Sequence, residues 1–227
     1  MASTGSVLAL QYKGGVLLAC DTLISYGSMA MIPNASRCVS ITKHTIVASS
    51  GSFADFQNVV AQLHELCQAK EIEYNCELDP SEVFTLLQRI MYNLRSNMQP
   101  LLCTIVVAGI QPRNGNSSEP LEFIGVIDNI GTHWTARYAG TSYAQHMAVP
   151  LIRESIEKEG LPASRDDALC LLRRCLQVLF YRECKAINRW LITDVTINGI
   201  TQAPPTTLDT EFSLRGYEFG KTALFRL

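Results

Sequence analysis

The sequence predicts an α+β fold in which two β-sheets pack face to face and helices cover both outer faces. Short apolar segments interrupted by glycines indicate strands, whereas longer segments with a 3.6-residue apolar period indicate helices. These elements follow the order strands, two helices, strands, two helices, strands. We see no internal repeat and no linker, so we expect one domain over residues 1–204 and an extension over residues 205–227.

Strands open the chain. Apolar segments with glycine breaks fill residues 5–22 and 38–51, with Gly-Gly as the first turn. Ser52 and Asp55 then form a helix start signal that resembles a capping box. The apolar period that follows predicts a helix to about Lys70.

A second helix begins at Asp79-Pro80, because proline suits the first helical turn. Strands follow at Cys103–Gln111 and Leu121–Asp128, separated by a polar turn at residues 112–118. The apolar stripe of the second helix consists of Val83, Phe84, Leu86, Leu87, Ile90, Met91 and Leu94.

The second half of the domain repeats this alternation. His133–Tyr138 reads as a strand, and helices are expected at about Tyr143–Glu159 and Ser164–Cys184. Strands Trp190–Thr196 and Ile200–Ala203 flank an Asn-Gly pair, which is a strong hairpin signal.

Composition excludes several functions. The chain has 19 Lys and Arg against 21 Asp and Glu, so we expect no basic face and no nucleic-acid partner. No apolar segment approaches the roughly 18 residues that span a bilayer, and the N-terminus does not read as a signal peptide. The 8 cysteines include no Cys-x-x-Cys pair and suit a reducing compartment, so we expect neither a metal site nor a cofactor.

Charged residues make up only 18% of the chain, below the usual proportion of about 25%. A low charge content has two explanations that composition does not separate. Either the core is large, or partner subunits cover much of the surface.

The strand–turn–strand of residues 5–21 resembles the N-terminus of proteasome beta subunits, which are N-terminal nucleophile hydrolases. In active members a threonine opens the first strand, and an aspartate ends the second strand sixteen positions later. Asp21 occupies the aspartate position, but the nucleophile position is Gly5, which has no hydroxyl. The resemblance therefore implies a four-layer αββα sandwich that has lost its nucleophile.

Further positions match the family motif but depart from its catalytic residues. The family's lysine, sixteen positions after the aspartate, is Arg37, which keeps the charge but cannot release its proton. The stretch Gly51–Gln57 resembles a family segment whose glycine contributes to the oxyanion hole. In the loop that resembles the family's Gly-Ser-Gly, Thr141 takes the serine position and Ser142 replaces a glycine.

The end of the last long helix departs in the same way. Active members carry an aspartate there and a serine three residues later, whereas this chain has Glu183 and Ala186 within Tyr181–Arg189. We therefore expect no catalytic residue. The degenerate site consists of Gly5, Asp21, Arg37, Thr141, Glu183 and Ala186.

Together with Ser25-Tyr26-Gly27-Ser28, these motifs resemble a non-catalytic class of beta subunit with little or no propeptide. The resemblance implies a structural subunit of the 20S core beta ring that supports ring assembly and half-particle joining for ATP- and ubiquitin-dependent protein degradation. The implied partners are beta subunits of the same and the opposite ring and the adjacent alpha ring, in cytoplasm and nucleus. Residues 205–227 would contact other subunits.

Two alternatives remain at this point. One is an active threonine peptidase that uses Thr4 after cleavage at Ser3, although a slip of one residue turns a strand side chain to the opposite face. The other is a free-standing binding protein. That reading would leave the apolar side chains of the extension in water: Leu208, Phe212, Leu214, Tyr217, Phe219, Leu224, Phe225 and Leu227.

Overall fold

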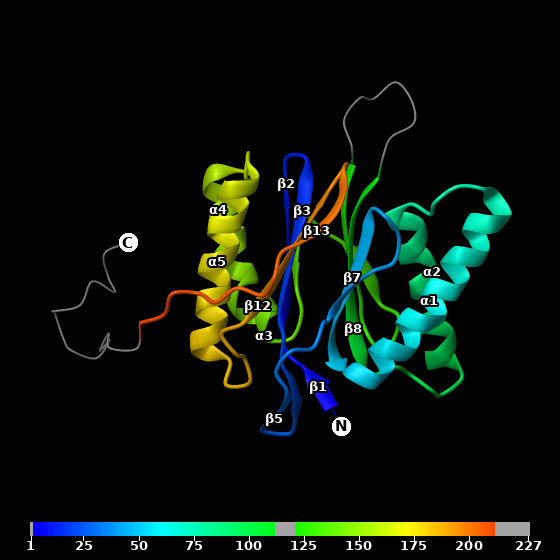
Figure 1. Cartoon of the computed structure of the whole chain (residues 1–227), viewed down its shortest axis with the longest axis horizontal. Helices are drawn as coiled ribbons and strands as arrows, with labels where there is room; N and C mark the ends of the chain where they lie inside the picture. Colours follow the sequence, from blue (N-terminus) through cyan, green and yellow to red (C-terminus); the bar gives the residue numbers. More distant parts are fainter. Residues whose placement is uncertain (1, 112–120, 212–227) are drawn as a thin grey trace.

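The computed structural model describes residues 2–111 and 121–211, and it contains two antiparallel sheets (Figure 1). The larger sheet has the order β10 (His133–Thr135), β9 (Leu121–Ile127), β8 (Cys103–Gln111), β7 (Thr45–Ser52), β1 (Ala2–Thr4), β4 (Ile24–Tyr26) and β5 (Met29–Ile32), with β6 (Cys38–Ser40) also paired to β7. The smaller sheet has the order β11 (Tyr138–Gly140), β2 (Val7–Tyr12), β3 (Gly15–Asp21), β12 (Trp190–Thr196) and β13 (Gly199–Gln202).

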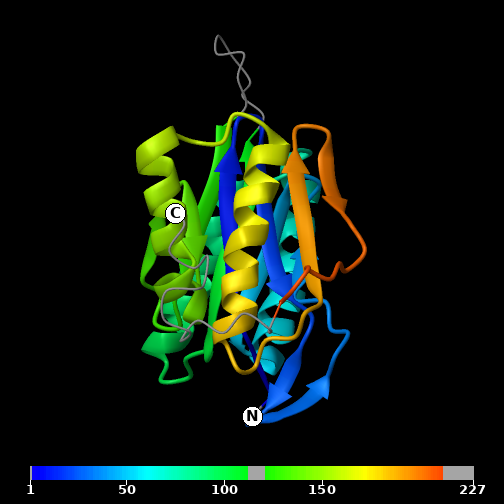
Figure 2. The same ribbon diagram turned by 90° about the vertical axis from the view of Figure 1, so that its left-hand side faces the viewer.

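Helices lie on the outer face of each sheet. α1 (Phe53–Tyr74) and α2 (Pro80–Ser96) pack on the larger sheet, and α3 (Tyr143–Met147), α4 (Val149–Glu159) and α5 (Arg165–Arg182) pack on the smaller one. Figure 2 shows α5 crossing in front of the smaller sheet. The predicted α+β class, with mixed helices and antiparallel sheets, is confirmed. No helix within the described ranges has the length and apolar character needed to cross a membrane.

The central strands β2 and β8 are buried on both faces, and both faces carry apolar side chains. In β2, Val7 and Ala9 join the cluster between the sheets, whereas Leu8 and Leu10 join the cluster beneath α3–α5. In β8 the same alternation divides its residues between the central cluster and the cluster under α1 and α2. Because both faces of these strands are buried, the strands appear in the sequence as continuous apolar segments without alternating polar residues.

The helix starts lie where the sequence signals predict them. The Ser52 hydroxyl accepts a hydrogen bond from the Asp55 amide at 3.4 Å, and Asp79 forms a capping box with Glu82 at the start of α2. α1 continues to Tyr74, beyond the predicted Lys70, because the exposed turns after Lys70 carry no helix-breaking residue.

Two local predictions were wrong, and one hairpin was missed. The segment predicted as one strand at 133–138 is divided between β10 and β11, which belong to different sheets. The helix predicted over 143–159 is two helices, α3 and α4, with Pro150 in the first turn of the second. The β4–β5 hairpin was missed, because β5 is exposed throughout and lacks the apolar alternation of a buried strand.

Candidate functional site

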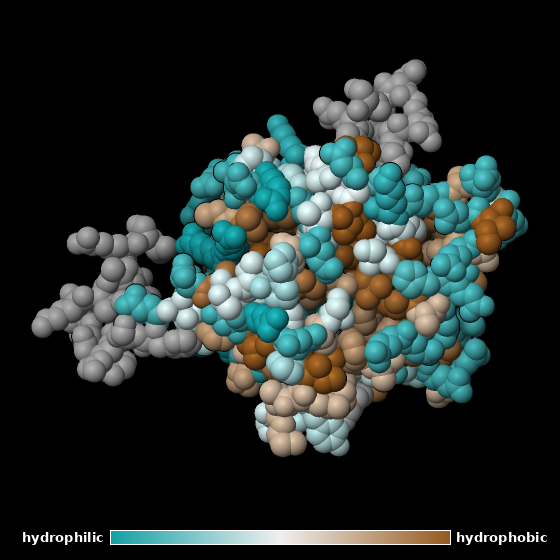
Figure 3. All heavy atoms as spheres, in the orientation of Figure 1, coloured by the Kyte–Doolittle hydropathy of each residue, from teal (hydrophilic) through white to brown (hydrophobic). Residues whose placement is uncertain are grey.

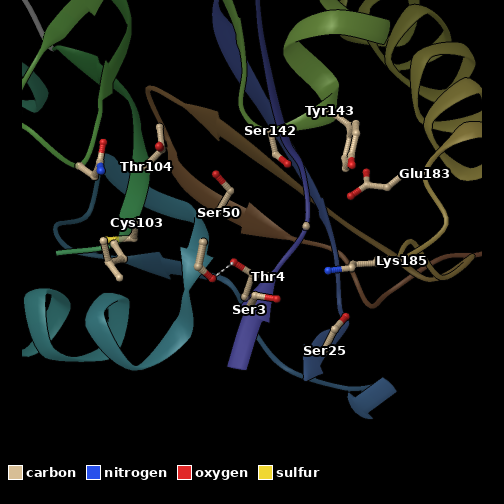
Figure 4. A pocket seen from close by; sticks show the side chains of 14 residues that line it. Ser3, Thr4, Ser25, Ser50, Cys103, Thr104, Ser142, Tyr143, Glu183 and Lys185 are labelled. Carbon is tan, nitrogen blue, oxygen red and sulfur yellow. Dashed lines mark hydrogen bonds between the residues drawn. The ribbon is translucent and has the colours of Figure 1, made fainter. Parts of the chain in front are cut away.

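A pocket of about 470 Å³ opens at one end of the two sheets, beside the connection between β1 and β2 (Figure 4). Its walls come from β1, β4, β7, β8, the start of α3 and the segment after α5. Seven of its lining residues carry hydroxyl groups: Ser3, Thr4, Ser25, Ser50, Thr104, Ser142 and Tyr143. The pocket therefore offers hydrogen bonds rather than an apolar surface.

Gly5 lines this pocket, and three of the predicted site residues surround it. A Cβ atom built on Gly5 would be 3.0 Å from Oε1 of Glu183, 3.6 Å from Oδ1 of Asp21 and 3.7 Å from Nη1 of Arg37. Four residues that are widely separated in the sequence thus meet at the position that the resemblance assigns to a nucleophile. The carboxylate of Glu183 lies in close contact with the point where a side chain would begin.

Arg37 lies fully buried behind Gly5 and forms an ion pair with Asp21. Its Nη2 donates hydrogen bonds to the carbonyl oxygens of Gly5 at 2.8 Å and Ser6 at 2.9 Å, and contacts that of Ser49 at 3.2 Å. A planar guanidinium can serve several acceptors at once, which a single ammonium group does with less geometric precision. Arg37 therefore ties the β1–β2 connection to β7, a structural role that does not require proton transfer.

Burial governs the ionisation of both acids. It raises the pKa of Asp21 to about 6, although the charge of Arg37 acts in the opposite direction. At pH 7 Asp21 is thus mostly ionised and compensates the buried guanidinium. Burial also raises the pKa of Glu183, while the hydrogen bond from Ser6 opposes that shift.

Ser6 connects Glu183 to the start of α3, a role that the sequence did not reveal. Its hydroxyl donates to Oε2 of Glu183 at 2.8 Å and accepts from the Ala144 amide at 3.1 Å. The position next to Gly5 was the only available signal, because serine is common in strands and loops alike. Lys185, which the sequence motifs did not single out, lines the pocket two residues after Glu183 (Figure 4).

Thr141 fixes the loop before α3 to β2. Its hydroxyl accepts from the Val7 amide at 3.1 Å, and its own amide donates to the Val7 carbonyl at 3.0 Å. Ser142 then has φ 55° and ψ −132°, and the Ala144 amide donates to the Thr141 carbonyl at 3.1 Å. This is the geometry of a type II′ turn with Ser142 at the position that favours glycine.

Ala186 does not contribute a side chain to the pocket. Its amide donates to the Glu183 carbonyl at 3.1 Å, while its side chain packs against the cluster beneath α5. Thr4, by contrast, lines the pocket within β1, where it pairs with Gly51 of β7. Its hydroxyl contacts the carbonyls of Gly51 at 3.2 Å and Ser49 at 3.3 Å, so it is held against the backbone.

Gly51 borders the pocket in a conformation that only glycine adopts easily. Its φ is +103°, and a Cβ atom at this position would be 2.5 Å from the Leu102 carbonyl oxygen. The segment therefore requires glycine for its backbone shape. Over residues 2–111 and 121–211, no three His, Cys, Asp or Glu side chains are grouped to hold a metal ion.

The family model described as "Proteasome subunit" matches residues 1–193. The chain is 34% identical to "Proteasome subunit beta type-4" of Xenopus laevis over 215 residues, covering 94% of this chain and 86% of the relative. It is 35% identical to the Arabidopsis thaliana protein of the same name over 211 residues, covering 92% and 82%. "Proteasome subunit beta type-7" of Saccharomyces cerevisiae is 28% identical over 207 residues, covering 86% and 74%.

Proposed function

Because this chain belongs to the proteasome subunit family, we propose that it is a type-4 beta subunit of the 20S core particle and holds its place in the ring without cleaving peptides. The resemblance to proteasome beta subunits, drawn from the sequence motifs, is confirmed by the relatives. We assign the layer order of the fold to the four-layer αββα sandwich of N-terminal nucleophile hydrolases.

The observation that supports a non-catalytic role is the arrangement around Gly5. An N-terminal nucleophile hydrolase needs a hydroxyl or thiol at this position to attack the peptide carbonyl. Residue 5 has none, and the carboxylate of Glu183 lies 3.0 Å from the point where a side chain would start. In a serine protease, removal of the nucleophile alone lowers kcat by about 10⁶-fold.

The described surface is suited to subunit contacts. The β4–β5 hairpin exposes four large apolar side chains, with Met29 65% and Met31 57% accessible. In Figure 3, apolar side chains also reach the surface between the two helical flanks. The other two of these four apolar side chains are Tyr26 and Ile32.

We assign beta subunits of the same ring, the opposite beta ring and the adjacent alpha ring as partners, in cytoplasm and nucleus. The domain of residues 1–204 would occupy the ring position. Residues 205–227 would contact other subunits and support the joining of half-particles. Of this extension, residues 212–227 lie outside the described residues.

Native mass spectrometry of the affinity-tagged chain tests the assignment, and a particle of 28 subunits is expected. Treating that particle with a threonine-directed epoxyketone should label other beta subunits and leave this chain unmodified. Recovery of a monomer would contradict membership of the particle. A covalent adduct on Thr4 would show instead that this residue is the nucleophile of an active subunit.

A further inference from the structure

The chain after the last strand does not leave the domain at once. Residues 206–211, which we call the arm, run from beside Trp190, at the start of β12, across the C-terminal part of α5 (Figure 1). Thr206 forms an isolated bridge with Trp190, with both backbone hydrogen bonds at 2.8 Å. The arm therefore begins as an addition to the smaller sheet.

The side-chain amide of Asn188 then pairs with the backbone of the arm, as the backbone of a neighbouring strand would. Its Oδ1 accepts from the Leu208 amide at 2.8 Å, and its Nδ2 donates to the Leu208 carbonyl at 2.7 Å. One side-chain amide thus satisfies both backbone groups of a single residue. The Leu208 side chain packs against the cluster beneath α5, which adds an apolar contact to the same point.

Two further side chains extend this contact along α5. Gln177 Nε2 donates to the Asp209 carbonyl at 2.8 Å, and the Tyr181 hydroxyl accepts from the Glu211 amide at 2.8 Å. Gln177 and Tyr181 are four residues apart, so they lie on the same side of the helix. The groups that bind the arm are uncharged at these contacts.

We infer that Gln177, Tyr181 and Asn188 form a docking strip that holds the arm and sets the direction in which the rest of the extension leaves the domain. The partner that the extension contacts then lies beyond the outer side of α5. The location of the partner rests on the proposed role of the extension, whereas the docking of the arm to the domain does not. An arm that is already ordered loses less conformational freedom when the extension binds, which favours association.

This strip also accounts for part of a sequence motif that the pocket leaves unexplained. Tyr181, in the last turn of α5, and Asn188, after the helix, flank Glu183, but Glu183 faces the pocket while the other two bind the arm. One short segment thus connects the degenerate site with the anchor of the extension.

Hydrogen–deuterium exchange on the full chain tests the docking directly. Asn188→Ala removes two neutral hydrogen bonds, so the Leu208 amide should exchange roughly tenfold faster. Tyr181→Phe keeps the ring and removes only the hydroxyl, so faster exchange is expected at Glu211. Arg182→Ala serves as the control, because this exposed residue takes part in none of the four hydrogen bonds to residues 208–211.

The acceleration should persist in 0.5 M salt, since the bonds are between uncharged groups. Exchange at the amides of β2 and β3 should stay at the wild-type rate and show that the domain remains folded. Wild-type exchange at Leu208 in Asn188→Ala, together with wild-type exchange at Glu211 in Tyr181→Phe, would overturn the docking strip.

The direction of the extension is tested by assembly. With residues 212–227 intact, the Asn188→Ala/Tyr181→Phe variant should join half-particles more slowly than wild type and faster than a chain truncated after Glu211. If truncation slows joining but the double variant does not, the arm does not direct the extension. If truncation itself has no effect, the proposed role of the extension fails, while the exchange result still decides the docking of the arm.

Discussion

The carboxylate of Glu183 lies beside the space that a side chain on Gly5 would enter. A Cβ atom there would be 3.0 Å from Oε1 of Glu183, closer than atoms normally approach without a shift. The hydroxyl of Ser6, the next residue, donates a hydrogen bond to Oε2 of the same carboxylate at 2.8 Å. The missing side chain and the glutamate are therefore two parts of one packing arrangement.

This relationship predicts that Gly5 and Glu183 are energetically coupled. Gly5→Ala should lower the free energy of unfolding by about 1–2 kcal/mol, because the added methyl group displaces the carboxylate. In the Glu183→Asp background the shorter side chain leaves more room, so the loss should be smaller by about 1 kcal/mol. Urea unfolding of the single and double variants measures the coupling, and strictly additive effects would contradict it.

A pH-dependent stability difference is expected for Glu183→Gln. Burial raises the folded-state pKa of Glu183 above its unfolded value, so ionisation is less favourable in the folded protein. Ionisation of Glu183 therefore costs the wild type stability as the pH rises from about 4 through the folded pKa, and the glutamine variant lacks this contribution. Glu183→Gln should match the wild type near pH 4 and become relatively more stable towards pH 7.

Unfolding curves at several pH values test this slope. The control is Glu154→Gln, because the hydrogen bond from exposed Lys158 lowers the pKa of Glu154, so its small effect should have the opposite sign. If the stability of Glu183→Gln relative to the wild type instead increases as the pH falls, the pKa of Glu183 is lowered rather than raised.

Arg37→Lys should destabilise the domain although it keeps the charge and restores the residue type that the active family pattern has. Lysine cannot reproduce the hydrogen bonds to the carbonyls of Gly5 and Ser6 together with the Asp21 pair. We expect a loss of about 2–4 kcal/mol, in the range found when buried charged contacts are removed. Thermal unfolding of the variant checks this, and an unchanged melting temperature would contradict the role assigned to Arg37.

Ser142→Gly should stabilise the protein. Ser142 has φ 55° and ψ −132°, and a non-glycine residue in such a region costs about 1–3 kcal/mol. Part of this gain is offset by the greater flexibility of glycine in the unfolded chain, so a net increase of about 1 kcal/mol is expected. Ser142→Ala is the matched control, since it removes the hydroxyl but keeps the strain, and equal stabilisation by both variants would refute the argument.

Truncation after Glu211 should leave the domain's unfolding transition unchanged, because the four hydrogen bonds that bind Leu208, Asp209 and Glu211 to the domain are retained. Half-particles should accumulate on native gels if residues 212–227 support their joining. The expected reason is the loss of apolar anchors, each of which contributes about 1.5–3 kcal/mol when buried. Normal amounts of full particle at the normal rate would contradict the proposed role of the extension.

Local pattern was sufficient for much of this protein. The strands Cys103–Gln111 and Trp190–Thr196 match their predicted bounds, because a buried strand flanked by turns shows in a short apolar segment. The resemblance to proteasome beta subunits, carried by local motifs, implied that Gly5, Asp21 and Arg37 share one site, and the structure brings them together.

Only the tertiary structure decided how the site is built and where the extension begins. Glu183 approaches Gly5, and Asn188 pairs with Leu208, because separate strands and helices pack against one another, and residue spacing does not specify the direction of a side chain across such contacts. The division of residues 133–138 between two sheets has the same origin. Local propensity marks where the chain is extended, but long-range hydrogen bonding selects the partner of each strand.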